Sequence, residues 1–305
     1  MAMRILWPNL PARLVPVATE AVGSGFELDF NEKFEDVSNE SWATADAVVG
    51  GCPPPYIDKL KACRIFVKYG VGYDDVDIER FGKLGIPVCN VPDYGTREVA
   101  DHAIALMMTL AKSVAYHDTE LRADLKGNWR PAHNPFGRRL SMCTFGVVGM
   151  GRIGTAVARR AGAFGMRVIH TDLHGGVPLD ELFATADVIS LHCPLTPATR
   201  HLVDARRLAL CKPTAVIINT ARGGIVDEQA LLEAKIFGAG LDVFEGEPKV
   251  DARLLANPRF VLAPHLGSAT TEARTQMAQL CANAVKAVLA SQRPPNLVNP
   301  EVTLG

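Results

Sequence analysis

The sequence predicts an α/β protein built from two doubly wound parallel-sheet domains, and three observations support this fold class. The chain has 305 residues, enough for about two domains of ordinary size. Short β-branched runs alternate with longer segments of helical period, which is typical of βα units around parallel sheets. A polar, proline-containing stretch, Gly127–Arg139, interrupts this alternation, which restarts directly after it.

The first hundred residues contain five short runs that we interpret as strands. Helical segments lie between them, for example Ile78–Leu84, which is followed by Gly85, a residue type that often ends a helix. The longest predicted helix is Thr96–Leu121, because its apolar residues recur at spacings of three and four. That spacing is compatible with a subunit interface and equally with burial in the core. The five predicted strands are Arg4–Leu6, Glu27–Phe30, Ala47–Val49, Arg64–Val67 and Pro87–Asn90.

The alternation resumes at Thr144–Val148 and ends with a long predicted helix, Thr271–Ala290. We place the boundary between the two halves near residue 100, close to the start of the first long helix. No internal repeat or low-complexity run is present. The strands predicted after Thr144–Val148 are Arg167–Thr171, Val188–His192, Ala215–Asn219, Ala239–Val243 and Phe260–Leu262.

Composition and charge exclude several classes of function. Lys and Arg number 32 and Asp and Glu 33, so the formal net charge of −1 gives no bulk attraction to nucleic acid or to an anionic membrane. No apolar run approaches the roughly 18 residues of a membrane helix, and the start of the chain lacks a signal-peptide core. Seven scattered cysteines without a CxxC pair are typical of a reducing compartment. We expect a cytoplasmic protein and, without an HExxH pair, no metal site.

A glycine-rich turn follows the strand Thr144–Val148. It reads Gly149-Met-Gly151-Arg152-Ile153-Gly154 and leads into a helical segment, Thr155–Phe164. In such a unit the first glycine permits the tight turn, the second lets a pyrophosphate approach the backbone, and the third lets the helix pack close to the strand. The N-terminus of the helix offers N–H groups and partial positive charge to the phosphates. This context favours a dinucleotide site over a purely structural turn.

The next strand leads to Asp172, which is 18 positions after Gly154. A carboxylate at this place can accept hydrogen bonds from the ribose hydroxyls of adenosine. Leu173 and His174 follow, and neither is the Arg or Lys that would bind a 2′-phosphate. The sequence therefore predicts NAD in preference to NADP.

Three further segments follow strands of the same half, at the edge where an open α/β sheet binds its ligands. They read Asn219-Thr-Ala-Arg222-Gly-Gly, Asp242-Val-Phe-Glu-Gly-Glu247-Pro and Ala-Pro-His265. Together with the glycine-rich turn and the earlier Lys68-Tyr-Gly-Val-Gly-Tyr-Asp-Asp, they resemble the D-isomer-specific 2-hydroxyacid dehydrogenases over nearly the whole chain. The ordered set is much more specific than any one motif, since each residue alone is commonly an ordinary loop residue.

The resemblance implies roles for three residues, and each suits the reduction of a 2-oxo acid. That reaction needs a hydride from the nicotinamide, a cation for the carboxylate and a proton for the carbonyl oxygen. Arg222, planar and permanently charged, would bind the carboxylate and the carbonyl oxygen. His265 would be general acid in reduction and general base in oxidation, since histidine titrates near neutral pH. Glu247 would orient the imidazole and favour its charged form.

The same resemblance implies further ligand contacts. Backbone N–H groups of Val71 and Gly72 would hold the substrate carboxylate, and Asp242 would bind the nicotinamide amide. Cys193 would line the cofactor path, and we interpret it as a packing residue rather than a reactive thiol. The predicted cofactor-binding residues are Thr96, Gly149, Gly151, Arg152, Ile153, Gly154, Asp172, Cys193, Pro194, Thr220, Ala221, Arg222, Asp242, His265 and Gly267.

The family fold implies a Rossmann coenzyme domain, residues 100–267, inserted in a flavodoxin-like substrate domain formed by residues 1–99 and 268–305. It also implies a homodimer, built partly on Thr96–Leu121. Three connections are shorter than is usual in the family: the one after Asp172, where the family usually has a longer loop with a further strand, the one after Ala234, and Pro248–Pro264. We expect these to change the surroundings of the adenine and to leave activity intact.

The favoured interpretation is an NAD-dependent oxidoreductase that interconverts a small 2-oxo acid, such as glyoxylate or hydroxypyruvate, and its D-2-hydroxy acid. An alternative is an NAD(H)-sensing binding protein similar to the C-terminal-binding-protein corepressors, which keep the same Arg, Glu and His. Slow turnover and an exposed peptide groove would distinguish it. A phosphite or formate dehydrogenase is disfavoured, because phosphite-oxidising relatives carry Lys at the position of Val71. The sequence determines neither the side chain of the substrate nor the preferred direction of the reaction.

Overall fold

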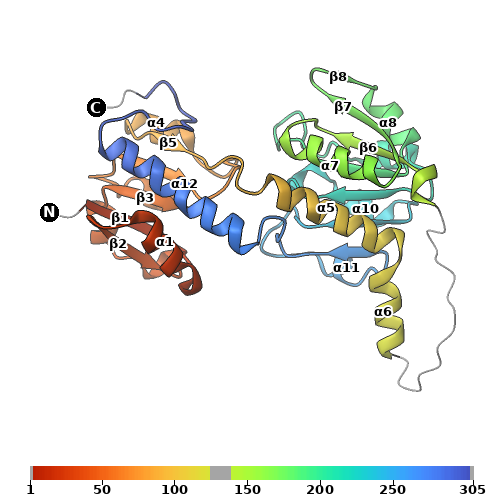
Figure 1. Ribbon diagram of the computed structural model, residues 1–305, viewed down its shortest axis with the longest axis horizontal. Coiled ribbons are helices and arrows are strands. Elements are labelled where there is room, and N and C mark those ends of the chain that lie inside the picture. Colours follow the sequence, from red (N-terminus) through yellow and green to blue (C-terminus); the bar gives the residue numbers. More distant parts are fainter. Residues whose placement is uncertain (1–2, 124–138, 303–305) are drawn as a thin grey trace. The chain divides into compact units, whose positions relative to one another are not determined.

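The computed structural model describes residues 3–123 and 139–302. Most of the stretch Gly127–Arg139 therefore lies outside the described residues. The chain separates into two compact units (Figure 1). Unit 1 comprises Met1–Tyr94 and Thr270–Gly305, and unit 2 comprises Gly95–Ala269. Both boundaries differ by a few residues from those predicted, and the predicted boundary near residue 100 would divide the helix Thr96–Ala111, which belongs whole to unit 2.

Unit 1 contains a five-stranded sheet in which every pair of neighbouring strands is parallel. The strand order is β2-β1-β3-β4-β5, which is the flavodoxin-like order. The strands are β1 (Met3–Pro8), β2 (Phe26–Asn31), β3 (Ala47–Gly50), β4 (Ile65–Lys68) and β5 (Val88–Cys89), and the helices are α1 (Val15–Val22), α2 (Asn39–Thr44), α3 (Pro54–Ile57), α4 (Ile78–Lys83) and α12 (Thr271–Leu289).

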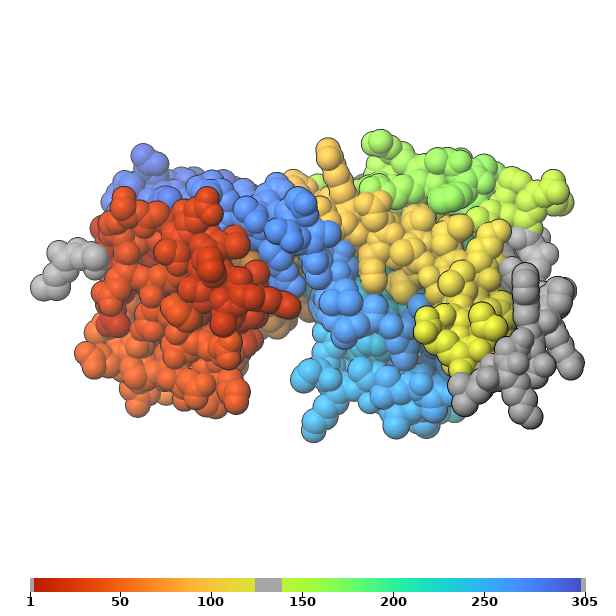
Figure 2. All heavy atoms as spheres, turned by 60° about the horizontal axis from the view of Figure 1, so that its bottom comes forward, coloured from red at the N-terminus to blue at the C-terminus, as the bar shows by residue number. Residues whose placement is uncertain are grey.

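Both faces of this sheet are buried, as the apolar composition of its strands requires. Leu6 and Phe66 pack with Trp42 on one face. Ile5 and Val67 pack on the other face, against α1 and α12. The C-terminal α12, blue in Figures 1 and 2, therefore packs on the N-terminal sheet, drawn in red and orange.

Unit 2 contains a seven-stranded sheet in the order β12-β11-β10-β9-β6-β7-β8. Counted from β6, this is the Rossmann order 3-2-1-4-5-6 with one more strand, so the predicted fold class is confirmed. The strands are β6 (Thr144–Val148), β7 (Arg167–Asp172), β8 (Gly175–Gly176), β9 (Val188–Leu191), β10 (Val216–Asn219), β11 (Gly238–Leu241) and β12 (Phe260–Leu262), and the helices are α5 (Thr96–Ala111), α6 (Val114–Ala123), α7 (Arg152–Ala163), α8 (Leu179–Thr185), α9 (Ala205–Leu210), α10 (Glu228–Glu233) and α11 (Ala252–Leu255).

The predicted helix Thr96–Leu121 is wrong as a single element, because it is broken between α5 and α6. The break lies at Ser113, whose φ of 54° is in the left-handed region. Leu106 and Leu110 of α5 are buried, whereas α6 contributes no buried residue. Neither Lys112 nor Ser113 is a helix breaker, so the apolar spacing gave no signal of the break.

The connection after Asp172 is short, as predicted, but it still forms a strand. Two glycines make β8, which pairs with β7 and is the antiparallel member of the sheet. Gly175 and Gly176 have φ of 145° and 104°, values that favour glycine. A tight hairpin thus stands where the classical Rossmann order has a helical crossover to a third parallel strand. No helix in the described residues is long and apolar enough to cross a membrane.

Candidate active site

The glycine-rich turn has the geometry of a dinucleotide site at the switch point of the sheet, where β6 lies between β7 and β9. A Cβ on Gly149, whose φ is 94°, would lie within 2.9 Å of the His192 carbonyl group. A Cβ on Gly154 would overlap the carbonyl oxygen of Gly149. Gly151 differs, because a Cβ there would have no described heavy atom within 4 Å. The second glycine therefore borders open space, as a site for a pyrophosphate requires.

Helix α7 begins directly at this open space. Gly151 is its N-cap, and no side chain of the described residues caps it, as suits a helix N-terminus that binds an anion. The helix starts at Arg152 rather than at the predicted Thr155, and Arg152, Ile153 and Gly154 therefore form its first turn.

Asp172 stands at the end of β7 beside the turn. Its Oδ2 accepts the N–H of Met150 at 2.7 Å, and its Oδ1 accepts the N–H of His174 at 3.3 Å. These backbone N–H groups, Met150 first, hold the pKa of Asp172 below its usual range. The group is therefore an anion at neutral pH, as binding of ribose hydroxyls and repulsion of a 2′-phosphate require.

The next two strand ends carry Cys193 with Pro194 and Thr220 with Ala221. Burial raises the pKa of Cys193 to about 11, so the thiol stays protonated at neutral pH, which agrees with a packing role. The Thr220 hydroxyl is buried and has no hydrogen-bond partner in the described part of the chain. An orphaned hydroxyl at the carboxyl edge of the sheet fits a site that a ligand completes.

The loop that carries Arg222 is held by Asn219, the last residue of β10. The Asn219 amide donates from Nδ2 to the Arg222 carbonyl at 2.9 Å and accepts the Ala221 N–H at 3.1 Å. A Cβ on Gly223 would overlap the backbone of Phe244, so this glycine permits the close contact between the two loops. The guanidinium donates to the Ala221 carbonyl at 2.7 Å.

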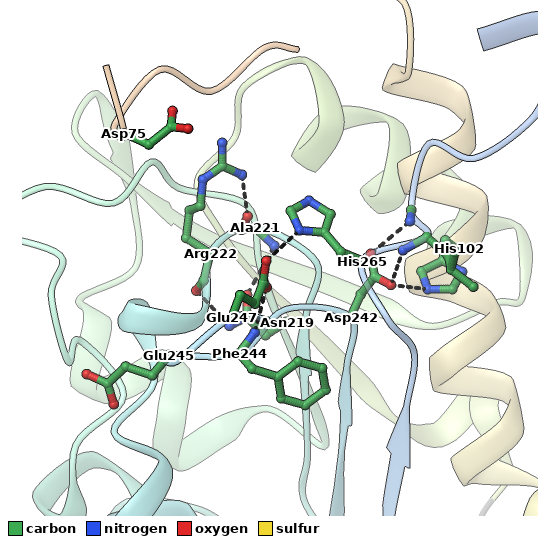
Figure 3. Close-up of polar contacts among 12 residues, drawn as sticks. Asp75, His102, Asn219, Ala221, Arg222, Asp242, Phe244, Glu245, Glu247 and His265 are labelled. Carbon is green, nitrogen blue, oxygen red and sulfur yellow. Dashed lines mark hydrogen bonds and ion pairs between the residues drawn. The ribbon is translucent and has the colours of Figure 1, made fainter. Parts of the chain in front are cut away.

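Glu247 and His265 form a hydrogen-bonded pair (Figure 3). Nδ1 of the imidazole lies 2.9 Å from Oε2 of the carboxylate. The other oxygen, Oε1, accepts the N–H of Phe244 at 2.9 Å. Because a carboxylate only accepts, Nδ1 carries a hydrogen, and Nε2 is the nitrogen that can exchange a proton with a substrate.

Asp242 is buried and is engaged by the segment that follows β12. Its two carboxylate oxygens accept the N–H groups of Leu266 and Gly267 at 2.7 and 2.8 Å. His102 of α5 approaches the same carboxylate, with Nε2 3.1 Å from Oδ1. Thr96 is the first residue of α5 in the same unit.

Sequence reasoning missed Asn219 and His102 as members of this site. A signal existed for each. Asn219 is an amide at the end of a buried strand, where it can form a turn. His102 is a polar residue beside the apolar stripe of a helix, three positions after Val99 and four before Leu106.

Unit 2 thus places the glycine-rich turn, Asp172, Cys193, Thr220, Asp242 and His265 at successive carboxyl ends of parallel strands. Val71 and Gly72 belong to unit 1, in the loop after β4, where the Val71 carbonyl accepts from Asn90 at 2.8 Å. Among the described residues, no group of three or more His, Cys, Asp or Glu is arranged for a metal ion.

A Rossmann sheet with this turn and with an arginine and a carboxylate–imidazole pair at its carboxyl edge defines a nicotinamide-dependent dehydrogenase. Residues 104–267 match the model of the NAD-binding domain of D-isomer specific 2-hydroxyacid dehydrogenases. The chain belongs to this family.

Relatives agree with the assignment. The chain is 43% identical over 258 residues to a glyoxylate reductase of Korarchaeum cryptofilum, covering 78% of this chain and 77% of that protein. It is similar to a D-lactate dehydrogenase from Aquifex aeolicus in complex with NAD and lactic acid, with 28% identity, a TM-score of 0.86 and coverage of 97% and 99%. An NADPH-dependent glyoxylate/hydroxypyruvate reductase from Sinorhizobium meliloti has 33% identity, a TM-score of 0.86 and coverage of 98% and 99%.

The protein is therefore an oxidoreductase that uses NAD to interconvert 2-oxo acids and D-2-hydroxy acids. The prediction of enzyme class and of cofactor is confirmed by the family and its relatives. The alternative of an NAD(H)-sensing binding protein is not favoured, since the relatives named above are enzymes.

Proposed function

We propose that the protein reduces a small 2-oxo acid of the glyoxylate or hydroxypyruvate type with NADH, through Arg222, Glu247 and His265. The observation that carries the proposal is the Glu247–His265 pair, because it fixes Nδ1 and leaves Nε2 for proton exchange. The names of the relatives from Korarchaeum cryptofilum and Sinorhizobium meliloti support the substrate class.

Each of the three side chains has one task. The Arg222 guanidinium binds the substrate carboxylate and polarises the carbonyl group. His265 delivers a proton from Nε2 to the carbonyl oxygen in reduction and takes it back in oxidation. Glu247 keeps the ring in place and balances the charge of the imidazolium, as the carboxylate of a catalytic triad does. NADH, when bound, supplies the hydride. The backbone N–H groups of Val71 and Gly72 are proposed as further donors to the carboxylate.

The cofactor would be held by the groups at the carboxyl edge of unit 2. The first turn of α7 would bind the pyrophosphate, and the carboxylate of Asp172 would accept the ribose hydroxyls and exclude a 2′-phosphate. The remaining proposed contacts are Thr96, Cys193, Pro194, Thr220, Ala221, Asp242 and Gly267.

The first experiment is to follow NADH oxidation by the purified protein with glyoxylate, hydroxypyruvate, pyruvate, phenylpyruvate and phosphohydroxypyruvate, with NADPH in parallel. Arg222→Ala is expected to lose most of the rate while NADH still binds. Arg206→Ala is the matched control, because Arg206 is an exposed residue of α9 that pairs with Asp180. Undiminished turnover by Arg222→Ala would refute the proposed role.

We also propose a cytoplasmic homodimer. The free state of all seven cysteines supports a reducing compartment. Helix α6, yellow in Figure 2, supports a subunit interface, because it buries no residue yet exposes Val114, Tyr116 and Leu121. Sedimentation is expected to give a dimer for the wild type and a monomer for Val114→Asp/Leu121→Asp. A wild-type monomer would refute the dimer.

A further inference from the structure

Three consecutive N–H groups around His265 all donate to Asp242. The N–H of His265 donates to the Asp242 carbonyl oxygen at 2.8 Å, that of Leu266 to Oδ1 at 2.7 Å and that of Gly267 to Oδ2 at 2.8 Å. A Cβ on Gly267 would lie 3.0 Å from Oδ2, so glycine suits the close approach. One aspartate thus binds the whole segment that carries the imidazole.

The backbone conformation of His265 explains why these hydrogen bonds are needed. Its φ is 53°, in the left-handed region that residues other than glycine seldom adopt. Such a conformation persists only where neighbouring groups determine it. The imidazole itself is 55% exposed, so packing restrains it little, and the hydrogen bonds from residues 265–267 to Asp242 must fix its base.

The carboxylate of Asp242 is in turn held by His102. The Asp242 side chain is only 2% exposed and the His102 side chain 22%, so their contact is largely shielded from water. A carboxylate only accepts hydrogen bonds, so Nε2 of His102 carries the hydrogen. With His102 as donor, Oδ1 has two partners, and the rotamer of Asp242 is fixed from the side of α5 as well as from the loop (Figure 3).

We propose that His102 is a positioning residue for the reaction: it fixes the Asp242 carboxylate, and through it the His265–Gly267 segment, so that the imidazole keeps its place. The proposal rests on the proposed function, since it assigns His102 to the site that His265 serves. His102 does not touch the reacting groups, and its effect is on orientation. A misplacement of about 1 Å can lower a rate by a factor of about a hundred.

The test compares His102→Leu, which removes the donor, with His102→Gln, whose amide Nε2 can occupy the place of the imidazole Nε2. His102→Leu is expected to lower kcat about tenfold to a hundredfold, with the KM for the 2-oxo acid little changed because Arg222 still binds it, and His102→Gln to restore most of kcat. Thr109→Val is the matched control, because it removes a different side-chain hydrogen bond from the same helix. If His102→Leu does not fold, the shorter amide of His102→Asn replaces it.

A second measurement is independent of turnover. Hydrogen exchange at the amides of residues 265–267, measured by NMR, is expected to accelerate in His102→Leu and to stay at the wild-type rate in His102→Gln and Thr109→Val. Wild-type exchange and wild-type kcat in His102→Leu would overturn the proposal, and so would a loss that His102→Gln does not restore. A wild-type protein that turns over no 2-oxo acid, with exchange changed as expected, would overturn the proposed function and leave the structural link from His102 to His265 intact.

Discussion

Glu247 and His265 meet at 2.9 Å, between Oε2 and Nδ1, while Oε1 of the same carboxylate accepts the N–H of Phe244. Glu247 therefore has a fixed orientation before any ligand arrives, because its own loop holds one oxygen. The imidazole takes its ring orientation from the other oxygen and its backbone position from Asp242. The Glu247 carboxylate thus orients the ring of His265, and the backbone carbonyl of Asp242 accepts the N–H of the same residue.

This relationship predicts the effect of Glu247→Gln. The amide oxygen can still accept the Phe244 N–H, but the negative charge beside the imidazole is lost. A hydrogen bond to a charged group contributes about 1.5–3 kcal/mol, so we expect kcat/KM to fall about tenfold to a hundredfold. NADH affinity, measured by fluorescence titration, should not change.

Glu245→Gln is the control for the loss of charge in the same loop. Glu245 is two residues away but pairs with Arg200 and His201 rather than with His265. Its variant should keep wild-type kcat/KM. Equal losses in both variants would show that the charge of the loop matters and the specific pair does not.

Two Gly→Ala substitutions in the glycine-rich turn are expected to have different effects, one on stability and the other on NADH affinity. Gly154→Ala places a Cβ on the Gly149 carbonyl oxygen and should cost about 3 kcal/mol of unfolding free energy or more. Gly151→Ala points into open space, at an ordinary φ of −68°, and should cost no more than about 1 kcal/mol. Its NADH affinity should nevertheless fall about tenfold or more, because the methyl group occupies the approach of the pyrophosphate. Denaturation curves and NADH titrations check both, and wild-type NADH affinity in Gly151→Ala would contradict the pyrophosphate site.

Asp172→Asn tests the choice between NAD and NADP. The amide oxygen can still accept the Met150 N–H, so the turn should keep its structure while the charge is lost. We expect the ratio of kcat/KM for NADPH to that for NADH to rise about tenfold or more, because the repulsion of the 2′-phosphate disappears. Asp180→Asn removes a charge from an exposed residue of α8 and should leave the ratio unchanged. An unchanged ratio in Asp172→Asn would remove Asp172 from the cofactor site.

The sequence predicts strands and strand-end motifs here better than it predicts helix ends and side-chain networks. Runs such as residues 216–218 are apolar because both faces of a parallel sheet are buried, and the polar residues after them must lie at one edge. The break at Ser113 was not predictable, because the backbone turns there without Gly or Pro. The sequence signal for the hairpin of β8 is limited to Gly175 and Gly176. His102 meets Asp242 across 140 positions of sequence, and only the packing of α5 on the sheet brings the two together.

His192 predicts how stability depends on pH. Burial lowers its pKa from the ordinary 6.5 to about 3, and its Nε2 lies 2.8 Å from the Ser190 hydroxyl, so the folded chain holds a neutral imidazole. Between these two values the unfolded chain binds a proton that the folded chain does not. The free energy of unfolding should therefore rise with pH through this window and become independent of this group above pH 6.5. One such group contributes at most about 1.4 kcal/mol per pH unit.

The measurement is urea unfolding of the wild type and of His192→Gln at several pH values from 4.5 to 7.5, a range chosen to cross the unfolded pKa of 6.5. Glutamine keeps a polar partner for Ser190 but cannot take up a proton, so the variant should lose less stability on acidification than the wild type. All other titrating groups are shared, and the difference in slope therefore isolates His192. Parallel pH profiles for the two proteins would mean that the imidazole is protonated alike in the folded and unfolded chain, and that its burial at the end of β9 carries no electrostatic cost.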